Sequence, residues 1–347
     1  MDSKQQYEWA VFIGRMQPPH NGHIRQILNA LDIAKNVVVV LGSNRAARNP
    51  KNPWSVEERE AMIRSCLPNK PLNFVSVNDY PYSEETWLAE VQSKVGLVTG
   101  DSNSVVLVGH KKDRSSYYLD SFPQWEQCLF SEWYDQVSAT EIRKSLFNGL
   151  DPSIIKDQGV ITESVSDWLA SFINTPEYKI LKDEYNYYQD YNKQWENAPY
   201  KPTFQTVDTV LVKSGHVLLV ERKLPPGVNQ LALPGGFVNS SEWLLDSAIR
   251  ELKEETRIKI EGIKHIQPYL RSYMVNQHVF DYPHRSLRGR TITMAYYVKL
   301  PDGGPLPLVK GSSDAKTAMW VSFRDILNSQ ERFFEDHLDI IGYFTGM

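Results

Sequence analysis

The first half of the chain alternates short apolar runs with segments of helical periodicity. Mainly apolar runs cover residues 9–13, 37–41, 74–77 and 105–108. Runs of this length are typical of parallel strands that are buried on both faces. Between them, apolar residues recur at helical spacing in residues 24–31, 56–66 and 84–95. This order predicts an α/β fold with a doubly wound parallel sheet and helices on both of its faces.

The second half has a different pattern of apolar and polar positions. Alternation and β-branched residues at 203–213 and 217–222 predict antiparallel strands joined at Ser214-Gly215. Before them, residues 164–195 have helical character, and Pro199 marks the exit from that helix. The change of pattern indicates a second domain of a different architecture.

These patterns divide the chain into three parts. We expect a first domain at residues 1–183, a helical linker at 184–200 and a second domain at 201–347. Two domains also suit the total length of 347 residues, because a domain holds about 150 residues.

Composition narrows the classes of function. The chain is 41% hydrophobic and 23% charged, with a formal net charge of −4 at pH 7. These values are ordinary for a globular protein and give no polybasic signal for nucleic acid or an anionic membrane. Cys66 and Cys128 form no Cys-x-x-Cys pair, which indicates a reducing compartment. We expect a cytoplasmic protein that acts on small molecules, without nucleic acid or membrane partners, and that could form a homo-oligomer.

The first candidate site is the segment Gly14–His23, between the first strand and the first helix. The free N–H groups at the start of a helix attract anions, and Gly22 allows close approach of the backbone. His20, His23 and Arg15 add side-chain donors suited to phosphate oxygens. The segment therefore predicts a cradle for nucleotide phosphates.

The spacing His-x-Gly-His at residues 20–23 resembles the signature of the nucleotidylyltransferase superfamily. The fuller segment Gly-Arg-x-Gln-Pro-x-His-x-Gly-His is similar to its nicotinamide mononucleotide (NMN) adenylyltransferase branch. This resemblance implies that a phosphate oxygen of NMN attacks the α-phosphorus of ATP, which yields NAD⁺ and pyrophosphate. Such chemistry needs alignment, charge stabilisation and Mg²⁺, but no protein nucleophile.

The resemblance also implies the residues of this first site. The catalytic residues would be Arg15, His20, His23 and Arg143. The nucleotide-binding and substrate-binding residues would be Gly14, Gln17, Gly22, Ser43, Asn44, Trp87, Gly109, His110, Lys112, Asp113, Ser138 and Thr140.

Two of these assignments have structural alternatives. Ser138-x-Thr140-x-Ile-Arg143 is similar to a second signature of the same superfamily, which meets the triphosphate of ATP. On the residues alone, however, Ser138-x-x-Glu141 is favoured as an ordinary capping box. Trp87 resembles an aromatic residue that stacks on nicotinamide, whereas a Trp within an amphipathic helix is commonly part of the core.

The second candidate site is a helix with three carboxylates. At about 100° per residue, Glu251, Glu254 and Glu255 gather at one edge of its apolar face. Like charges this close are unfavourable unless cations neutralise them, and carboxylate oxygens suit Mg²⁺ or Mn²⁺. With Gly236, Glu242 and Arg250 in register, the pattern resembles the Nudix box. Its last glycine, which would suit a left-handed turn, is Arg257 here, so the geometry of that turn stays open.

Taken together, the chain resembles the bifunctional NMN adenylyltransferase/Nudix hydrolase (ADP-ribose pyrophosphatase) family. The resemblance implies a Rossmann-like nucleotidylyltransferase domain followed by a Nudix α/β/α sandwich. The second domain would hydrolyse ADP-ribose to AMP and ribose 5-phosphate. The partners would be ATP, NMN, NAD⁺ and ADP-ribose, with Mg²⁺ in both domains and Mn²⁺ as a possible substitute.

The residues of the second site follow from the same resemblance. The metal site would consist of Gly236, Glu251, Glu254 and Glu255, of which Glu254 and Glu255 would also be catalytic. Asp314 is a candidate acid in a loop similar to one of ADP-ribose-hydrolysing Nudix enzymes. From the residues alone, Arg288 and Arg290, which precede the strand at residues 291–298, could hold a diphosphate, although arginines on an edge strand are as often merely solubilising. Arg222 is a further candidate for binding substrate.

Three alternatives remain open. The Nudix-like domain could be a dinucleotide sensor without catalysis, although such a sensor has no need of the three glutamates. The chain could be a transcriptional regulator, but no basic helix-turn-helix is evident. The first domain could also use another mononucleotide, such as a flavin or pantetheine phosphate.

Overall fold

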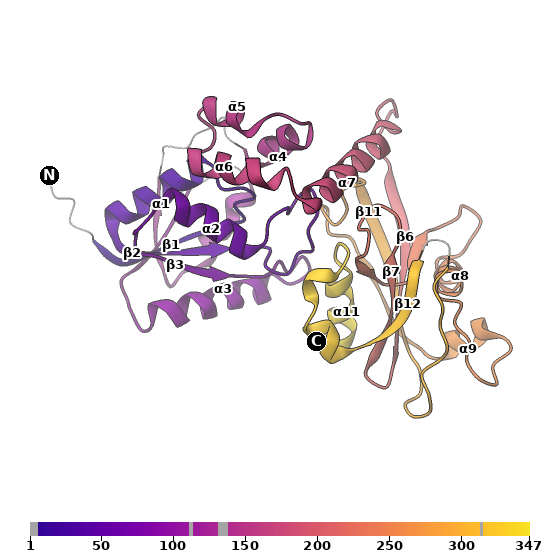
Figure 1. The fold of residues 1–347 in the computed structure, drawn as a ribbon. Helices are drawn as coiled ribbons and strands as arrows, with labels where there is room; N and C mark the ends of the chain where they lie inside the picture. The colour runs from indigo at the N-terminus through magenta and orange to yellow at the C-terminus, as the bar shows by residue number, and fades with distance from the viewer. Residues whose placement is uncertain (1–5, 111–113, 131–137, 313–314) are drawn as a thin grey trace. The chain divides into compact units, whose positions relative to one another are not determined.

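The computed structural model describes residues 6–110, 114–130, 138–312 and 315–347. It forms two compact units, Met1–Asp183 and Glu184–Met347 (Figure 1). The division falls inside helix α7 (Pro176–Lys193). Glu184 and Tyr188 of α7 are buried, and the Asn192 side chain donates to the carbonyl of Leu287 at 3.3 Å. The first half of the expected linker is therefore a packed part of the second unit.

The first unit contains a parallel sheet in the order β3-β2-β1-β4-β5. Its strands are β1 (Tyr7–Gly14), β2 (Ala34–Leu41), β3 (Leu72–Ser76), β4 (Val105–Gly109) and β5 (Glu126–Leu129). This arrangement confirms the predicted doubly wound fold. The periodicity missed β5, because an edge strand with exposed polar residues has no apolar run.

Helices cover both faces of this sheet. They are α1 (Asn21–Ile33), α2 (Val56–Cys66), α3 (Glu84–Thr99), α4 (Ala139–Phe147), α5 (Pro152–Asp157) and α6 (Glu163–Phe172), with a 3₁₀ turn at Arg114–Ser121. One apolar cluster joins Ile27 of α1 and Ile63 of α2 to one face, and another joins Val91 of α3 to the opposite face. Two separate cores therefore hold the sheet rigid.

The strand order creates a switch point beside β1. The chain moves outward through β2 and β3 and then returns to β4, on the other side of β1. Ligands of doubly wound sheets bind at the carboxyl ends of the strands on either side of such a point. Here those ends are Gly14 and Gly109, and the Gly42 N–H donates to the Gly14 carbonyl at 3.1 Å.

The second unit is a sandwich around a mixed sheet in the order β10-β11-β6-β7-β12, in which β9 also pairs with β6 and β8 with β7. The strands are β6 (Thr203–Lys213), β7 (His216–Arg222), β8 (Leu231–Ala232), β9 (Gly235–Phe237), β10 (Met274–Phe280), β11 (Arg290–Lys299) and β12 (Ala315–Ser322). The predicted hairpin at Ser214-Gly215 is confirmed by the antiparallel pairing of β6 and β7. The pair β6 and β11 is parallel.

Helices lie on both faces of the second sheet as well. They are α8 (Leu244–Thr256), α9 (Ile266–Ser272), α10 (Phe323–Leu327) and α11 (His337–Thr345), with a 3₁₀ turn at Gln330–Arg332. Figure 1 shows α8 and α9 on one side of the sheet and α11 on the other. Neighbouring residues of β11 face these two layers: Tyr296 packs in the cluster of Ala248, and Tyr297 stacks on Phe344. The result is the expected α/β/α sandwich.

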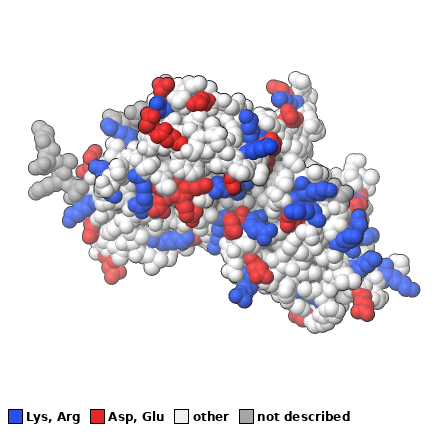
Figure 2. All heavy atoms as spheres, viewed as in Figure 1, with Lys and Arg blue, Asp and Glu red and all other residues white. Residues whose placement is uncertain are grey.

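The surface carries charges of both signs. On the face drawn in Figure 2, acidic and basic side chains are interspersed over each unit. Within the described residues, no helix has the length and apolar character needed to cross a membrane.

Candidate active sites

The loop after β1 brings the two predicted histidines together. His20 stands immediately before α1, and its backbone N–H donates to Nδ1 of His23 at 3.3 Å. Their rings are stacked with centroids 3.6 Å apart, and the side chain of His20 is buried. Gly22 is buried in the first turn of the same helix. Both imidazoles are thus fixed at a helix start, where anions are favoured.

Gln17 positions this loop. Its amide nitrogen donates to the carbonyl of Trp54 at 2.8 Å, and its amide oxygen accepts the Trp54 N–H at 3.1 Å. The buried Arg59 donates to the carbonyls of Arg15 (2.6 Å) and Gly42 (2.8 Å). The binding role predicted for Gln17 stays a prediction, because these contacts give its side chain a structural task. The sequence carried no signal for Arg59, which lies among ordinary helix-forming residues.

Three cationic side chains gather around the loop. Arg15 is exposed, whereas Arg143 reaches in from α4 and donates to the carbonyls of Gln17 and of Pro50, the latter at 3.1 Å. Burial, with Arg15 and Arg143 nearby, lowers the pKa of Lys51 to about 8. Burial and Arg15 lower the pKa of Arg143 to about 10. A bound anion would stabilise the charged forms of Lys51 and Arg143, which burial disfavours. Lys51 was not predicted, because it lies in an irregular segment without periodicity.

The start of α4 confirms the helix cap but not the full capping box. Oγ of Ser138 accepts the N–H of Thr140 at 3.3 Å, and Arg143 donates to Oγ1 of Thr140 at 3.2 Å. Glu141 instead pairs with Lys144 at 2.8 Å. Ser138, Thr140 and Arg143 therefore lie on one helix turn, as a phosphate site at this helix end requires.

The loop after β2 contributes polar groups to the same sheet edge. Ser43 is buried with a positive φ of 57°, and its hydroxyl donates to Asp79 at 2.5 Å. The Asn44 amide lies 3.4 Å from the side-chain oxygen of Asn78. A non-glycine residue with positive φ is costly and is found preferentially at functional loops.

The loop after β4 lies at the same edge. Nδ1 of His110 is 2.9 Å from the carbonyl of Phe130, and a Cβ on Gly109 would meet Leu119 at 2.8 Å. Trp87 packs edge-on against Tyr118 and Phe122, as the core alternative requires. Its stacking on nicotinamide stays a prediction. Lys112 and Asp113 lie outside the described residues.

In the second unit, the segment before α8 meets the predicted carboxylates. A Cβ on Gly236 would lie 2.7 Å from Oε1 of Glu251, so a side chain there would displace that carboxylate. A Cβ on Gly235 would lie 2.2 Å from the backbone carbonyl of Val207, so only glycine fits at that position. The N–H of Gly235 donates to Glu255 at 3.1 Å. Arg250 spans the other acids, with contacts of 2.8 Å to Glu242, 2.8 Å to Glu251 and 3.0 Å to Glu254. The three predicted carboxylate ligands thus lie along one side of α8, next to Gly235 and Gly236.

The electrostatics of these carboxylates suit a divalent cation. Burial raises the pKa of Glu255 to about 8, and burial also raises the pKa of Glu251. A buried carboxylate that resists ionisation gains most from a nearby positive charge. Hard carboxylate oxygens suit Mg²⁺ or Mn²⁺, and Glu251, Glu254 and Glu255 are the side chains that would hold the ion. Their oxygens are not gathered around one point, however: among the described residues, Glu335, Asp336 and His337 are the acidic and histidine side chains whose ligand atoms all lie within 4.8 Å of one another.

The departure from the Nudix box at Arg257 is accommodated without loss of the turn. Arg257 adopts the left-handed conformation (φ 45°, ψ 34°) that the box glycine would supply. Its N–H still donates to the carbonyl of Lys253 at 2.9 Å. The turn therefore keeps the geometry that a glycine would give it, and the left-handed conformation of Arg257 costs roughly 1–2 kcal/mol.

The predicted substrate arginines divide into two groups. Nε of Arg222 donates to the carbonyl of Pro226 at 2.6 Å, and its guanidinium lies 4.2 Å from the ring centre of Phe334. The Arg288 guanidinium lies 6.0 Å from the same ring centre, so these two cations are neighbours. Arg290 donates to the carbonyl of Asp281 instead. Asp314 lies outside the described residues.

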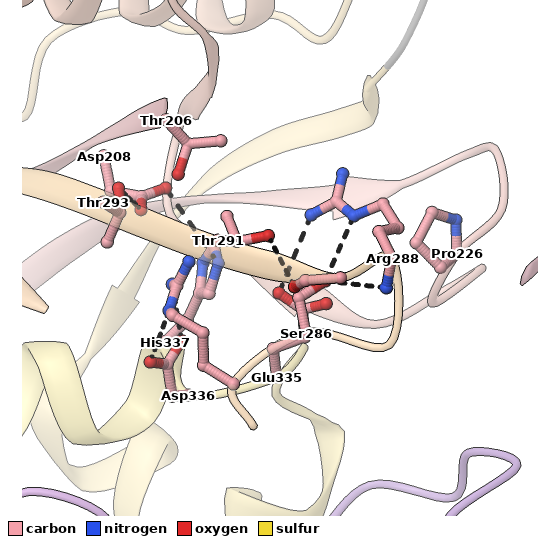
Figure 3. A network of polar contacts seen from close by, with 12 residues as sticks. Thr206, Asp208, Pro226, Ser286, Arg288, Thr291, Thr293, Glu335, Asp336 and His337 are labelled. Carbon is pink, nitrogen blue, oxygen red and sulfur yellow. Dashed lines mark hydrogen bonds and ion pairs between the residues drawn. The ribbon is translucent and has the colours of Figure 1, made fainter. Parts of the chain in front are cut away.

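A buried polar network lies behind this site (Figure 3). Arg285 binds both carboxylate oxygens of Asp336, at 2.8 and 2.7 Å. Thr293 donates to Asp208 at 2.6 Å, and Nδ1 of His337 accepts the N–H of Leu233 at 2.8 Å. The sequence carried no signal for this network, since its members come from strands, a loop and the last helix.

Comparison with known proteins covers both units. A model described as Cytidylyltransferase-like matches residues 11–145, and a NUDIX domain model matches residues 202–341. A nicotinamide/nicotinic acid mononucleotide adenylyltransferase of Acinetobacter baylyi is 34% identical over 182 residues, which cover 52% of this chain and 94% of that protein. An ADP-ribose pyrophosphatase of Methanocaldococcus jannaschii is 34% identical over 135 residues, which cover 39% of this chain and 69% of that protein.

One solved structure matches almost the whole length. It is a bifunctional NMN adenylyltransferase/ADP ribose pyrophosphatase from Francisella tularensis, complexed with AMP and a Mn ion. The sequence identity is 35%, the TM-score is 0.88, and the match covers 98% of this chain and 99% of that chain.

A doubly wound nucleotidylyltransferase unit followed by a Nudix unit defines a class of two-domain nucleotide-processing proteins. Within this class, the chain belongs to the family of bifunctional NMN adenylyltransferase/ADP-ribose pyrophosphatase proteins. The predicted fold class and family resemblance are therefore confirmed.

Proposed function

We propose that this chain is a bifunctional enzyme of NAD metabolism. The first unit transfers the adenylyl group of ATP to NMN. A phosphate oxygen of NMN attacks the α-phosphorus of ATP, the bond from this phosphorus to the bridging oxygen breaks, and pyrophosphate leaves. The products are NAD⁺ and pyrophosphate.

The support in the first unit is the cationic cluster at the switch point. Arg15, Lys51 and Arg143 surround a loop whose helix start carries His20 and His23. These groups align the triphosphate and offset the charge that develops on the departing pyrophosphate. We propose that Mg²⁺, bound with the nucleotide, shares this task.

The second unit hydrolyses ADP-ribose to AMP and ribose 5-phosphate by adding one water across the diphosphate. The observation that carries this proposal is the wall of Glu251, Glu254 and Glu255, held at Gly235 and Gly236. Mg²⁺ or Mn²⁺ held there would polarise the diphosphate and acidify a water molecule. We propose that Arg222 and Arg288, which both lie near the ring of Phe334, hold diphosphate oxygens.

A second unit that only senses a dinucleotide would not need the three carboxylates Glu251, Glu254 and Glu255. The partly buried Glu255, whose pKa is raised to about 8, is costly to ionise, and a protein that only binds a dinucleotide would gain by replacing it. We therefore favour catalysis in the second unit.

Two assays of the purified full-length protein test the proposal. In the presence of ATP and Mg²⁺, the protein should form NAD⁺ from NMN. A parallel assay with nicotinic acid mononucleotide shows whether the enzyme prefers the nicotinamide or the nicotinic acid base. Protein with ADP-ribose should release AMP and ribose 5-phosphate only when Mg²⁺ or Mn²⁺ is present. Hydrolysis that persists in excess chelator would exclude the metal mechanism.

A further inference from the structure

The segment Leu233–Gly236 carries the backbone groups that meet the carboxylates of α8. The Gly235 N–H donates to Glu255 at 3.1 Å, and the missing side chain of Gly236 leaves room for Glu251. A shift of this segment would therefore displace two proposed metal ligands at once. What holds the segment in place decides how the metal site is formed.

His337 holds the start of this segment. Its Nδ1 accepts the N–H of Leu233 at 2.8 Å, and both residues are buried, with relative exposures of 6% and 2%. Pro234 has no N–H, so the hydrogen bond to His337 is made by the last donor before Gly235. The Pro234 carbonyl accepts the N–H of Thr209 at 2.9 Å, which ties the middle of the segment to β6.

The chemistry of the imidazole suits this task. Because Nδ1 accepts a hydrogen bond, the ring proton of the neutral form is on Nε2, which lies 4.0 Å from Oδ1 of Asp208. Burial lowers the pKa of His337, which keeps the ring neutral and Nδ1 free of a proton. Arg285 opposes protonation too, whereas Asp208, Asp336 and Glu335 favour it.

The surroundings of His337 prevent it from following the segment if the segment moves. Asp336, the preceding residue, is bound at both oxygens by Arg285, and these two side chains are only 5% and 2% exposed. Asp208 is fixed by Thr293 and lies opposite Gly235 in the ladder of β6 and β9. Figure 3 shows Asp208, Thr293, Asp336 and His337 converging from the sheet and from the start of α11.

We propose that His337 is a positioning residue of the Nudix site: through the Leu233 N–H it fixes the segment 233–236, and with it the geometry in which Glu251 and Glu255 bind a divalent cation. This inference rests on the proposed hydrolase function. In the proposed role His337 acts on the site through the backbone of Leu233 and is not itself a ligand of the ion at the glutamates.

A crossed pair of substitutions in the full-length protein separates the hydrogen bond from the packing. His337→Leu keeps most of the buried volume and removes the acceptor. His337→Asn loses volume and keeps an acceptor oxygen. Ile340→Ala serves as the matched control, because Ile340 is fully buried on the same helix and its loss opens a cavity while the hydrogen bond between His337 and Leu233 is kept. Calorimetric titration with Mn²⁺ gives the metal affinity, and thermal melts give the stability.

We expect His337→Leu to weaken Mn²⁺ binding by roughly 10–100-fold, the range for residues that orient metal ligands. ADP-ribose hydrolysis should fall with it, and NAD⁺ synthesis should not change. His337→Asn should bind Mn²⁺ nearly as wild type does, although its melting temperature falls. Ile340→Ala should lower the melting temperature and leave the Mn²⁺ affinity unchanged.

Wild-type Mn²⁺ affinity in His337→Leu, or equally weakened binding in His337→Leu and Ile340→Ala, would overturn the positioning role. If His337→Leu does not fold, His337→Asn decides, because a folded Asn variant with strongly weakened Mn²⁺ binding contradicts the proposal. Wild-type protein that binds Mn²⁺ but hydrolyses no ADP-ribose would count against the proposed function and leave this test intact.

Discussion

The two candidate sites manage like charges in opposite ways. The first gathers the cations Arg15, Lys51 and Arg143, and the pKa values of the last two are lowered. The second gathers carboxylates, and the pKa of Glu255 is raised. In both sites, burial disfavours the charged form that function needs. A ligand of opposite charge would stabilise that form: an anionic nucleotide in the first site and a divalent cation in the second.

The difference lies in how each charge is compensated inside the protein. In the second unit Arg250 contacts Glu242, Glu251 and Glu254, whereas the partly buried Glu255 accepts a backbone N–H from Gly235. In the first unit Arg143 is held by carbonyl oxygens of Gln17 and Pro50, which carry no full charge. A substitution should therefore affect stability and catalysis in different proportions in the two sites.

The largest effect should come from Glu255→Gln. Hydrolysis of ADP-ribose should fall roughly 10³-fold or more, since a preorganised charge is lost at the metal site. NAD⁺ synthesis should stay at the wild-type rate. The raised pKa means that wild-type stability falls as pH rises from the unfolded-state value toward about 8. Without metal at pH 7, the Gln variant should therefore melt at a higher temperature than wild type.

Glu254→Gln provides the contrast for that prediction. Its carboxylate is 60% exposed and pairs with Arg250 at 3.0 Å, so loss of its charge should not stabilise the protein. Hydrolysis should nevertheless be lost. If Glu255→Gln lowers the metal-free melting temperature, the carboxylate wall is an ion-paired surface and not a metal site.

The next largest effect should come from His20→Ala and His23→Ala. Each should reduce NAD⁺ synthesis roughly 10²–10³-fold, the usual result of removing a preorganised donor. ADP-ribose hydrolysis is the internal control and should not change. His23→Ala also removes the acceptor of the His20 N–H, so it should lower stability by about 1 kcal/mol as well. Rates within about twofold of wild type in both variants would exclude the phosphate cradle.

A smaller effect is expected from Arg143→Ala. Loss of a charged hydrogen-bond donor costs about 1.5–3 kcal/mol, or roughly 10–100-fold in kcat/KM. Both KM for ATP and kcat should change, because Arg143 also holds the carbonyls of Gln17 and Pro50. Steady-state kinetics with varied ATP is the measurement. A fall in melting temperature without any kinetic change would show that Arg143 only stabilises the start of α4 and does not act on ATP.

The smallest effect should be the pH dependence of ATP binding through Lys51. Its pKa of about 8 in the ligand-free protein means that it loses its charge as pH rises through this value. KM for ATP should therefore rise at alkaline pH, by less than about tenfold for one screened cation. Lys51→Arg should flatten this dependence because arginine stays charged. An identical pH profile in the two proteins would remove Lys51 from the site.

The sequence by itself determined those features that depend on local periodicity. Mainly apolar runs identified four of the parallel strands, and the spacing of Glu251, Glu254 and Glu255 placed three carboxylates on one helical edge. Both follow from the fixed geometry of strands and helices. The chain order of strand and helix then limited the first unit to a doubly wound sheet.

Only the tertiary structure decided which partner each buried polar group has. Gln17 meets Trp54 across 37 positions, and Leu233 meets His337 across 104. Local spacing carries no information on such pairs, because they form where separate elements pack. For the same reason Lys51 and Arg59 escaped prediction. The carboxylates of the second site could be predicted because they lie on one helix. The cations of the first site come from separate loops and from α4, so they meet only when the whole unit is folded.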